Sequence, residues 1–231
     1  MPRQLEKYAN EIWKNLNYIA NWPLNRKIRI GDIGFLENKS QFRRQSKIDR
    51  RKIKFSTIAG TSKAELTYST RNKVCIDFKA AGEAPLSPDS VLSNAQAEIT
   101  ITFKREGAGI LHIMEHKTKE IEDFESLCEP LLGFYSDRRW DWSFMVVASV
   151  MEATSATIIV SDSKDARAEL IAKTNIGAPQ LNLANLNAGL ELRRQKGLDI
   201  FVIARESVTP LFQLAHFKKF RNKTTLKLYN D

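Results

Sequence analysis

Cysteine is scarce in this sequence, and several other features are missing altogether. Only Cys75 and Cys128 occur among 231 residues, too few for a disulfide framework, which indicates two buried thiols in a cytosolic protein. No stretch comes near the ~18 consecutive apolar residues that a membrane-spanning helix requires. The N-terminus carries charges throughout and lacks the apolar segment of a secretory signal. We therefore expect a cytoplasmic protein, and 42% apolar with 27% charged residues is typical of a globular fold.

Motifs that would indicate catalysis are also missing. The sequence has no Gly-rich phosphate loop, no Gly-x-Ser-x-Gly motif and no Cys/His cluster with metal-ligand spacing. HIMEH, from His112 to His116, matches the H-x-x-E-H motif of one class of zinc peptidases. That motif has to be helical, whereas here it follows a glycine turn and is expected to be extended, with its histidines about 13 Å apart. A metallopeptidase is kept as an alternative, and the prediction is a non-enzymatic protein without metal or cofactor.

Positive charge is concentrated in the first quarter of the chain. Residues 1–60 carry 14 Lys/Arg and 5 Asp/Glu, whereas residues 61–231 carry 22 of each. The densest stretch is FRRQSKIDRRKIKF, from Phe42 to Phe55. Because the excess lies in one region, it predicts a directed surface for an acidic partner, either a nucleic acid or an anionic membrane.

Residues 1–22 are predicted to form an amphipathic helix that ends before Pro23. Its apolar stripe recurs at three- and four-residue steps: Leu5, Tyr8, Ala9, Ile12, Trp13, Leu16 and Ile19. Two interpretations remain open. The stripe packs on the core, or a face with Ile12 and Trp13 enters a lipid interface.

Residues 23–60 are predicted to form a basic hairpin. Ile28, Ile30, Ile33 and Phe35 suggest an outgoing strand, residues 38–40 a turn, and Phe42 the start of the return. Within the return, the alternation of Ile53 and Phe55 with lysines predicts a loop that leads into a strand at 52–55.

The rest of the chain alternates in a way typical of antiparallel strands. Residues 61–116 and 155–197 are candidate hairpin regions, the second containing a charge-free tract at 174–190, and residues 198–231 supply closing strands and a tail. The apolar run at 144–153 predicts a strand buried on both faces. A second helix is expected over 117–135, with a kink at Pro130. We predict one α+β domain, a twisted and mostly antiparallel sheet with an N-terminal amphipathic helix and a central helix.

This order of elements resembles the membrane-inserting domain of the gasdermin family. The residues that carry the resemblance are PLNRKIRIGDIGFLE, the basic return FRRQSKIDRRKIKF, FESLCEPLLGFYSDRRWDWS, the apolar strand FMVVASVMEA and the closing GLDIFVIARESVTPLFQLAHFKKF. Two departures are that no cysteine precedes Cys75, where bacterial members carry one near the N-terminus for lipid attachment, and that little sequence follows TTLKLYN. The repressing element would then be this short tail or a partner protein, or the chain would hold none.

The resemblance implies a pore-forming protein. It would bind anionic lipid, self-associate, insert its two hairpin regions as barrel strands at the inner face of the plasma membrane, and kill the cell, in bacteria as a defence against phage. An activating protease or a repressor would be its partners. The lipid-binding residues are predicted to be Ile12, Trp13, Lys14, Arg43, Arg44, Lys47, Arg50, Arg51, Lys52 and Lys54. The alternative is a soluble basic module that binds nucleic acid or a protein through the cluster at 43–54.

Overall fold

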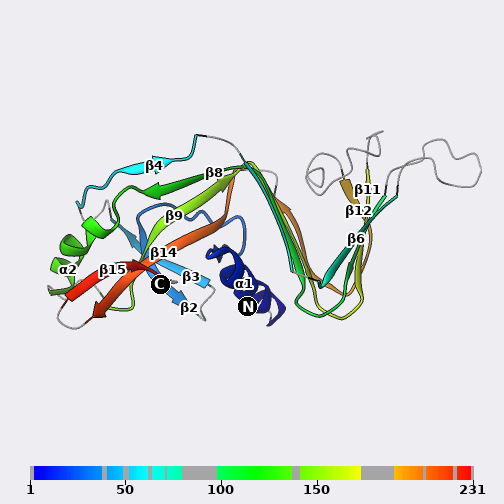
Figure 1. Cartoon of the computed structure of the whole chain (residues 1–231), viewed down its shortest axis with the longest axis horizontal. Coiled ribbons are helices and arrows are strands. Elements are labelled where there is room, and N and C mark those ends of the chain that lie inside the picture. Colours follow the sequence, from blue (N-terminus) through cyan, green and yellow to red (C-terminus); the bar gives the residue numbers. More distant parts are fainter. Residues whose placement is uncertain are drawn as a thin grey trace, which may run out of the picture. The chain divides into compact units, whose positions relative to one another are not determined.

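The computed structural model describes residues 3–37, 41–48, 52–61, 64–70, 72–79, 98–136, 141–172, 190–204, 207–220 and 223–229. Its helical elements are α1 (Arg3–Leu16), a 3₁₀ turn (Glu125–Leu127) and α2 (Cys128–Ser136). Its strands are β1 (Ile19–Ala20), β2 (Asp32–Glu37), β3 (Gln41–Lys47), β4 (Thr57–Ala59), β5 (Ala64–Ser69), β6 (Val74–Lys79), β7 (Glu98–Phe103), β8 (Gly109–Ile121), β9 (Met145–Ala153), β10 (Ser155–Ser161), β11 (Ala166–Ala172), β12 (Leu190–Lys196), β13 (Leu198–Ala204), β14 (Val208–Phe220) and β15 (Lys223–Leu228) (Figure 1). The α+β class, with its mostly antiparallel sheet, N-terminal helix and central helix, is confirmed. The expected turn at 38–40 and most of the charge-free tract lie outside the described residues.

Contacts divide the chain into two compact units. The first unit comprises Met1–Tyr8, Glu65–Met114 and Ser155–Arg205, and the second comprises Ala9–Ala64, Glu115–Thr154 and Glu206–Asp231. α1 and β8 each contribute residues to both units. Neither described helix is long and apolar enough to cross a membrane.

The first unit contains two layers of strands in the same order. One layer runs β13–β10–β8–β5 and the other runs β12–β11–β7–β6. Each strand continues into its counterpart through a short connection. The described residues of these four connections, 70 with 72–73, 104–108, 162–165 and 197, form what we call the crease. Figure 1 shows the ribbons that lead into β6, β11 and β12 turning back at the crease.

The core of the first unit lies between its two layers. On β7 and β11 alternate residues point inward and are buried: Ile99, Ile101, Phe103, Ala166, Ala168 and Leu170. They pack against Ala108 of the connection 104–108, Ile110 of β8 and Ile159 of β10. The period-two pattern that predicted these strands therefore marks the faces that the crease brings together.

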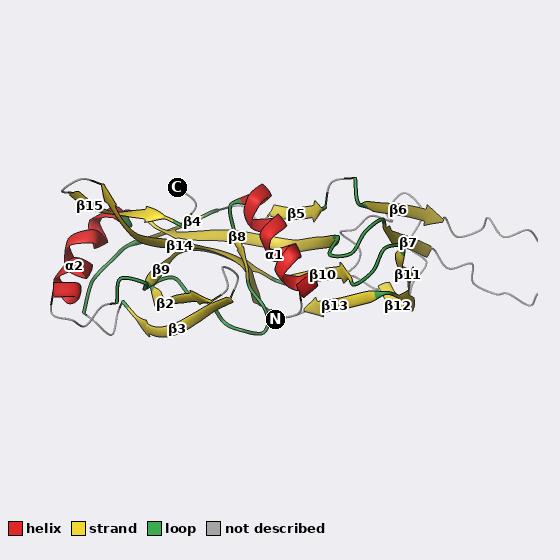
Figure 2. Ribbon diagram, turned by 90° about the horizontal axis from the view of Figure 1, so that it is seen from below, coloured by secondary structure: helices red, strands yellow, loops and turns green. Residues whose placement is uncertain are grey.

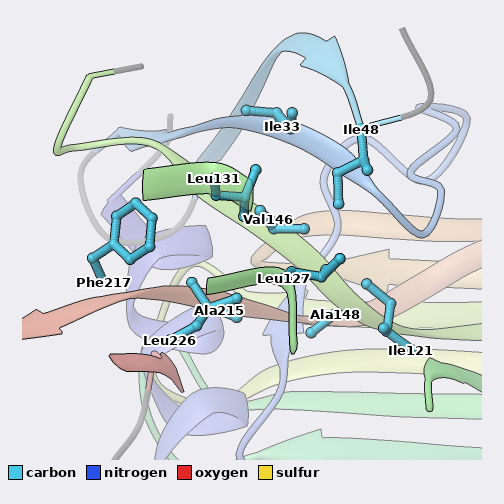
Figure 3. Packing of buried hydrophobic residues seen from close by; sticks show 10 residues of the cluster. All are labelled: Ile33, Ile48, Ile121, Leu127, Leu131, Val146, Ala148, Ala215, Phe217 and Leu226. Carbon is cyan, nitrogen blue, oxygen red and sulfur yellow. The ribbon is translucent and has the colours of Figure 1, made fainter. Parts of the chain in front are cut away.

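The second unit is built around β9 and β14. β14 pairs with β1, β9 and β15, β9 also pairs with β2 and β8, and β3 adds to β2 (Figure 2). The β9 pattern, an almost unbroken buried run, confirms the strand predicted at 144–153. α2 and the 3₁₀ turn cover one face of β9, β14 and β15, where Leu127 and Leu131 pack with Val146, Phe217 and Leu226 (Figure 3).

Three boundary predictions are wrong. α1 ends at Leu16 and not before Pro23, because Asn17 adopts a left-handed conformation (φ 58°) and closes the helix by donating its N–H to the Trp13 carbonyl. Residues 117–121 extend β8 instead of starting the second helix. Pro130 is the third residue of α2 and lies in its first turn, where a missing N–H costs nothing, so it starts the helix and does not kink it.

The structure contains the predicted basic hairpin, but the strand predicted at 52–55 is wrong. The return is β3 at Gln41–Lys47, whereas residues 53–56 form no strand. A register shift between Ile33 and Gly34 leaves Gln45 as an extra residue between the pairs Ile33–Ser46 and Gly34–Arg44. Next to this β-bulge, Arg43 and Arg44 are both exposed while Phe42 is buried.

We expect Gly34→Ala to lower the free energy of unfolding by at least about 2 kcal/mol. The added Cβ would lie 1.9 Å from the Arg43 carbonyl oxygen, so β3 would have to move. Gly133→Ala is the matched control, because a Cβ there on α2 meets nothing within 4 Å, and it should stabilise by about 0.5–1 kcal/mol. Urea unfolding followed by circular dichroism measures both. Wild-type stability of Gly34→Ala would contradict the close approach of β2 and β3.

Candidate anion-binding groove

An electropositive groove of about 890 Å³ lies in the second unit. One wall is the loop at 26–29, and the other is β3 at 43–47. Its basic residues are Arg26, Lys27, Arg29, Arg43, Arg44 and Lys47, joined by Ile28, Gln45 and Ser46. Among the described lining residues none is acidic, so the groove offers six cations to a ligand.

The loop wall is held in place by backbone acceptors. The Asn21 side-chain amide donates to the carbonyl oxygens of Arg26 (2.7 Å) and Thr209 (2.9 Å), which fixes the loop to β14. A turn between Pro23 and Arg26 shapes the loop further. Arg26 then donates through a terminal nitrogen to the Phe42 carbonyl (2.8 Å), which links the loop to β3. Hydrogen bonds therefore connect the two walls. The Arg26 bond leaves its positive charge uncompensated, because its partner is the neutral Phe42 carbonyl.

Two carboxylates lie close to the arginines of β3. Glu37 Oε2 is 2.7 Å from Arg43 Nε, an exposed pair that contributes little stability. Asp32 is fully buried, accepts the Arg29 backbone N–H through Oδ2 (3.0 Å), and lies 3.8 Å from the Arg44 guanidinium. No described residue hydrogen-bonds its Oδ1. Burial raises the pKa of Asp32, and the Arg29 N–H with the nearby cations of Arg44, Lys47 and Arg29 lowers it in part.

The arrangement suits a polyanion better than a catalytic role. Six cations against two neighbouring carboxylates leave a net positive field, and arginine forks present paired donors that match phosphate oxygens. The mouth is open to solvent, so a headgroup or backbone phosphate can enter without displacing a strand. The groove is therefore the candidate anion-binding surface of the described residues.

Three predicted site residues meet in this groove, namely Arg43, Arg44 and Lys47. Lys52 and Lys54 are exposed but do not line it, and Arg50 and Arg51 lie outside the described residues. Arg26, Lys27 and Arg29 line the groove but are not among the predicted site residues, because the alternation of apolar residues predicts an outgoing strand there. Their positive charge could have indicated them, because residues 26–29 belong to residues 1–60, which hold the whole excess of positive charge.

The three predicted residues on α1 are placed differently from one another. Ile12 is fully buried, so the interpretation of α1 as a helix packed on the core is confirmed for that side chain. Trp13 is half-buried and stacks on Tyr229 with ring centroids 5.6 Å apart. Lys14 is exposed. In this conformation Ile12 is unavailable to lipid, which corrects its expected position on an outward face.

The histidines of the alternative metal site lie on β8, which is extended as the sequence predicted. The His112 ring Nδ1 is 2.8 Å from the Thr67 hydroxyl oxygen. Burial lowers the pKa of His116, and a hydrogen bond with the Ala64 backbone partly offsets this. The described residues contain no group of three or more His, Cys, Asp or Glu side chains that could hold a metal ion.

Comparison with known proteins gave a similarity in structure but none in sequence. No protein-family model matches the sequence, and a search of curated proteins found no match. Among solved structures, the chain is similar to a bacterial gasdermin from Bradyrhizobium tropiciagri, with 14% identity over 96% of this chain and 90% of that chain and a TM-score of 0.40. These values do not assign the chain to that family, and the function proposed below rests on the groove and the strands of this chain.

Asp32→Asn is expected to stabilise the protein at neutral pH by about 1 kcal/mol, because it removes a buried charge and keeps an oxygen for the Arg29 N–H. A raised pKa means that Asp32 favours folding below its ordinary value of 3.8 and that this contribution is lost as the pH rises through the raised value. The gain from the substitution should therefore shrink as the pH falls toward 3.8. Urea unfolding of both proteins across this range tests it. A loss of stability at neutral pH would mean that the cations stabilise the carboxylate more than burial opposes it.

Proposed function

We propose that this chain is a gasdermin-like pore-forming protein. It starts in the cytoplasm, binds the anionic inner face of the plasma membrane, self-associates and permeabilises the bilayer. The observation that carries the proposal is the crease, because two strand layers of the same order, joined pairwise by short connections, can open into one sheet of longer strands.

Opening the crease supplies strands of the length that a bilayer requires. β5 and β6 have six residues each, β10 to β13 have seven each, and β7 has six and leads into the longer β8. Joined pairwise, they exceed the roughly 10 residues of a membrane-crossing strand. The inward face of β7 and β11 is apolar, while Thr102, Arg167 and Glu169 occupy the other face, an alternation suited to lipid on one side and water on the other.

The groove provides the initial attraction to the membrane. Basic residues near an anionic surface contribute about 1 kcal/mol each, so Lys27, Arg29 and Lys47 together give reversible binding before any insertion. Lys14 adds to this attraction from α1, and Arg50, Arg51, Lys52 and Lys54 extend it along the chain. Trp13 inserts once its stacking partner moves, and Ile12 follows only if α1 leaves the core.

The cellular role follows from permeabilisation. Opening the membrane of its own cell would stop phage propagation, which is the antiphage defence that the family resemblance implies. Such an activity needs control, so an activating protease or a repressor partner belongs to the proposal.

The same groove favours a second candidate, a module that binds nucleic acid. Phosphates of a nucleic-acid backbone fit the same six cations. However, a single-stranded ligand also needs aromatic platforms beside the charge, and no aromatic residue is among the described lining residues. Binding to a protein partner through the cluster at 43–54 uses the same charges.

Vesicles loaded with a self-quenched dye test the main proposal. We expect dye release from vesicles that contain phosphatidylglycerol and little release from phosphatidylcholine vesicles, with both the full chain and a chain trimmed after β15 assayed. High salt should reduce binding, since the attraction is electrostatic. If neither protein releases dye from any vesicle, pore formation is wrong.

Reversing two groove charges tests the binding surface. Lys27→Glu/Lys47→Glu should weaken sedimentation with phosphatidylglycerol vesicles at least about tenfold. Lys117→Glu/Lys164→Glu is the control, because it changes net charge equally at two exposed lysines outside the groove. Equal effects of the two pairs would mean that net charge, and not the groove, governs binding. A groove-dependent and salt-dependent affinity for single-stranded RNA or DNA, without vesicle binding, would support the second candidate instead.

A further inference from the structure

The crease has a conformational signature that goes beyond its topology. In each of its four connections one described residue has a positive φ: Asn72 (54°), Gly107 (72°), Asp165 (61°) and Gly197 (65°). Glycine, asparagine and aspartate are the residue types that tolerate the left-handed region most readily. Straightening a strand therefore requires at least this residue to move to the extended region.

Hydrogen bonds join neighbouring connections into a line. The N–H of Gly107 donates to the Ser161 carbonyl and the N–H of Ser161 donates to the Ala108 carbonyl, both at 2.9 Å. On either side, Lys104 donates to Lys73 (2.8 Å) and Asp162 to Gly197 (2.9 Å). Because the connections are bonded to one another, a group that holds one of them closed restrains them all.

The first two turns of α1 lie directly on one connection. Lys7 Nζ is 2.9 Å from Glu106 Oε1, and the pKa of Glu106 is lowered by this hydrogen bond and the Lys7 charge, with Arg3 adding a smaller effect. The contact is also steric, since a Cβ on Gly107 would lie 2.9 Å from Lys7 Cδ and one on Gly109 would lie 2.7 Å from the Tyr8 ring. α1 therefore approaches closely both Gly107 in the connection and Gly109 at the start of β8.

Two features make this contact one that can be released. The side chains of Lys7 and Glu106 are 40% and 41% exposed, so an anionic surface can compete with Glu106 for the lysine. The Tyr8 ring is fully buried, and no described residue hydrogen-bonds its hydroxyl. A buried hydroxyl without a partner destabilises the closed state relative to one in which water reaches it.

We propose that residues 3–8 of α1 clamp the crease shut, and that an anionic membrane releases the clamp by drawing Lys7 away from Glu106. This rests on the proposed function, since the clamp regulates the same opening of the strands. Membrane contact and strand release are then coupled through one exposed ion pair, and a separate sensor domain is not needed.

A reversible cross-link tests the clamp. Lys7→Cys and Gly107→Cys, in a Cys75→Ser/Cys128→Ser background, bring two thiols together. An added Cβ at position 107 lies 3.1 Å from Lys7 Cβ, so a small outward shift of α1 reaches the spacing of about 3.5–4.5 Å in disulfides. The oxidised protein should bind phosphatidylglycerol vesicles normally but release dye at least about tenfold more slowly than after reduction. The two single-cysteine variants, treated identically, are the controls. Equal release before and after reduction, with the cross-link verified by mass spectrometry, would overturn the clamp.

A second measurement needs no membrane. It also needs no cysteine at position 107, where a positive φ disfavours any residue but glycine. Lys7→Glu should speed amide hydrogen exchange at Gly107 and Ser161 by about two- to fivefold, and the exchanged pair Lys7→Glu/Glu106→Lys should restore the protection, as expected for an exposed ion pair. Tyr8→Phe should slow the same exchange, since it removes the unpaired hydroxyl. If exchange behaves this way but no form releases dye, the clamp stands and pore formation fails. If the charge exchange restores nothing, the clamp fails whatever the vesicles show.

Discussion

The apolar faces of β7 and β11 have to be kept from water, and most of the first unit is arranged to do so. Ile99, Ile101, Phe103 and Leu170 would be exposed on an open sheet, and folding the same ribbon back on β8 and β10 buries them. The strands that cover these faces are β8 and β10, which continue β7 and β11 through the crease. No separate layer of helices takes part in this core cluster of the described residues. Lipid would contact these apolar faces favourably without any cover. The sheet therefore has to fold back on itself only in water.

The groove depends on packing some distance from its charges. β3 is held through β2, which pairs with β9 only at Ile33 and Gly34, the residues beside the bulge. Phe42 anchors β3 by packing on Phe212 (ring centroids 5.8 Å apart), while its carbonyl receives Arg26. The buried Asp32 carboxyl and its Arg29 N–H hold the loop wall from beneath. The cations are therefore placed by one bulge, one aromatic contact and one buried carboxyl.

The sequence predicted what depends on local periodicity and failed where a single residue or a distant partner decides. The strands at β6, β7 and β9, and the helix α1 with its buried stripe, follow from alternation and three-to-four spacing. The early end of α1 depends on the left-handed Asn17, and the position of the basic strand at Gln41–Lys47 depends on its pairing with β2. The cluster at 43–47 could be predicted from charge alone, whereas its union with Arg26 and Arg29 required the hydrogen bond from Arg26 to Phe42.

The stack of Trp13 on Tyr229 joins the end of α1 to the residue that follows β15. Tyr229 also meets His216 edge-on and donates its N–H to the Leu214 carbonyl, so it is fixed to β14 as well. Trimming that removed Tyr229 would uncover one whole indole face beside the exposed Lys14. Removal of Tyr229 would thus change the surface of α1, because the Trp13 ring would become available to a new neighbour.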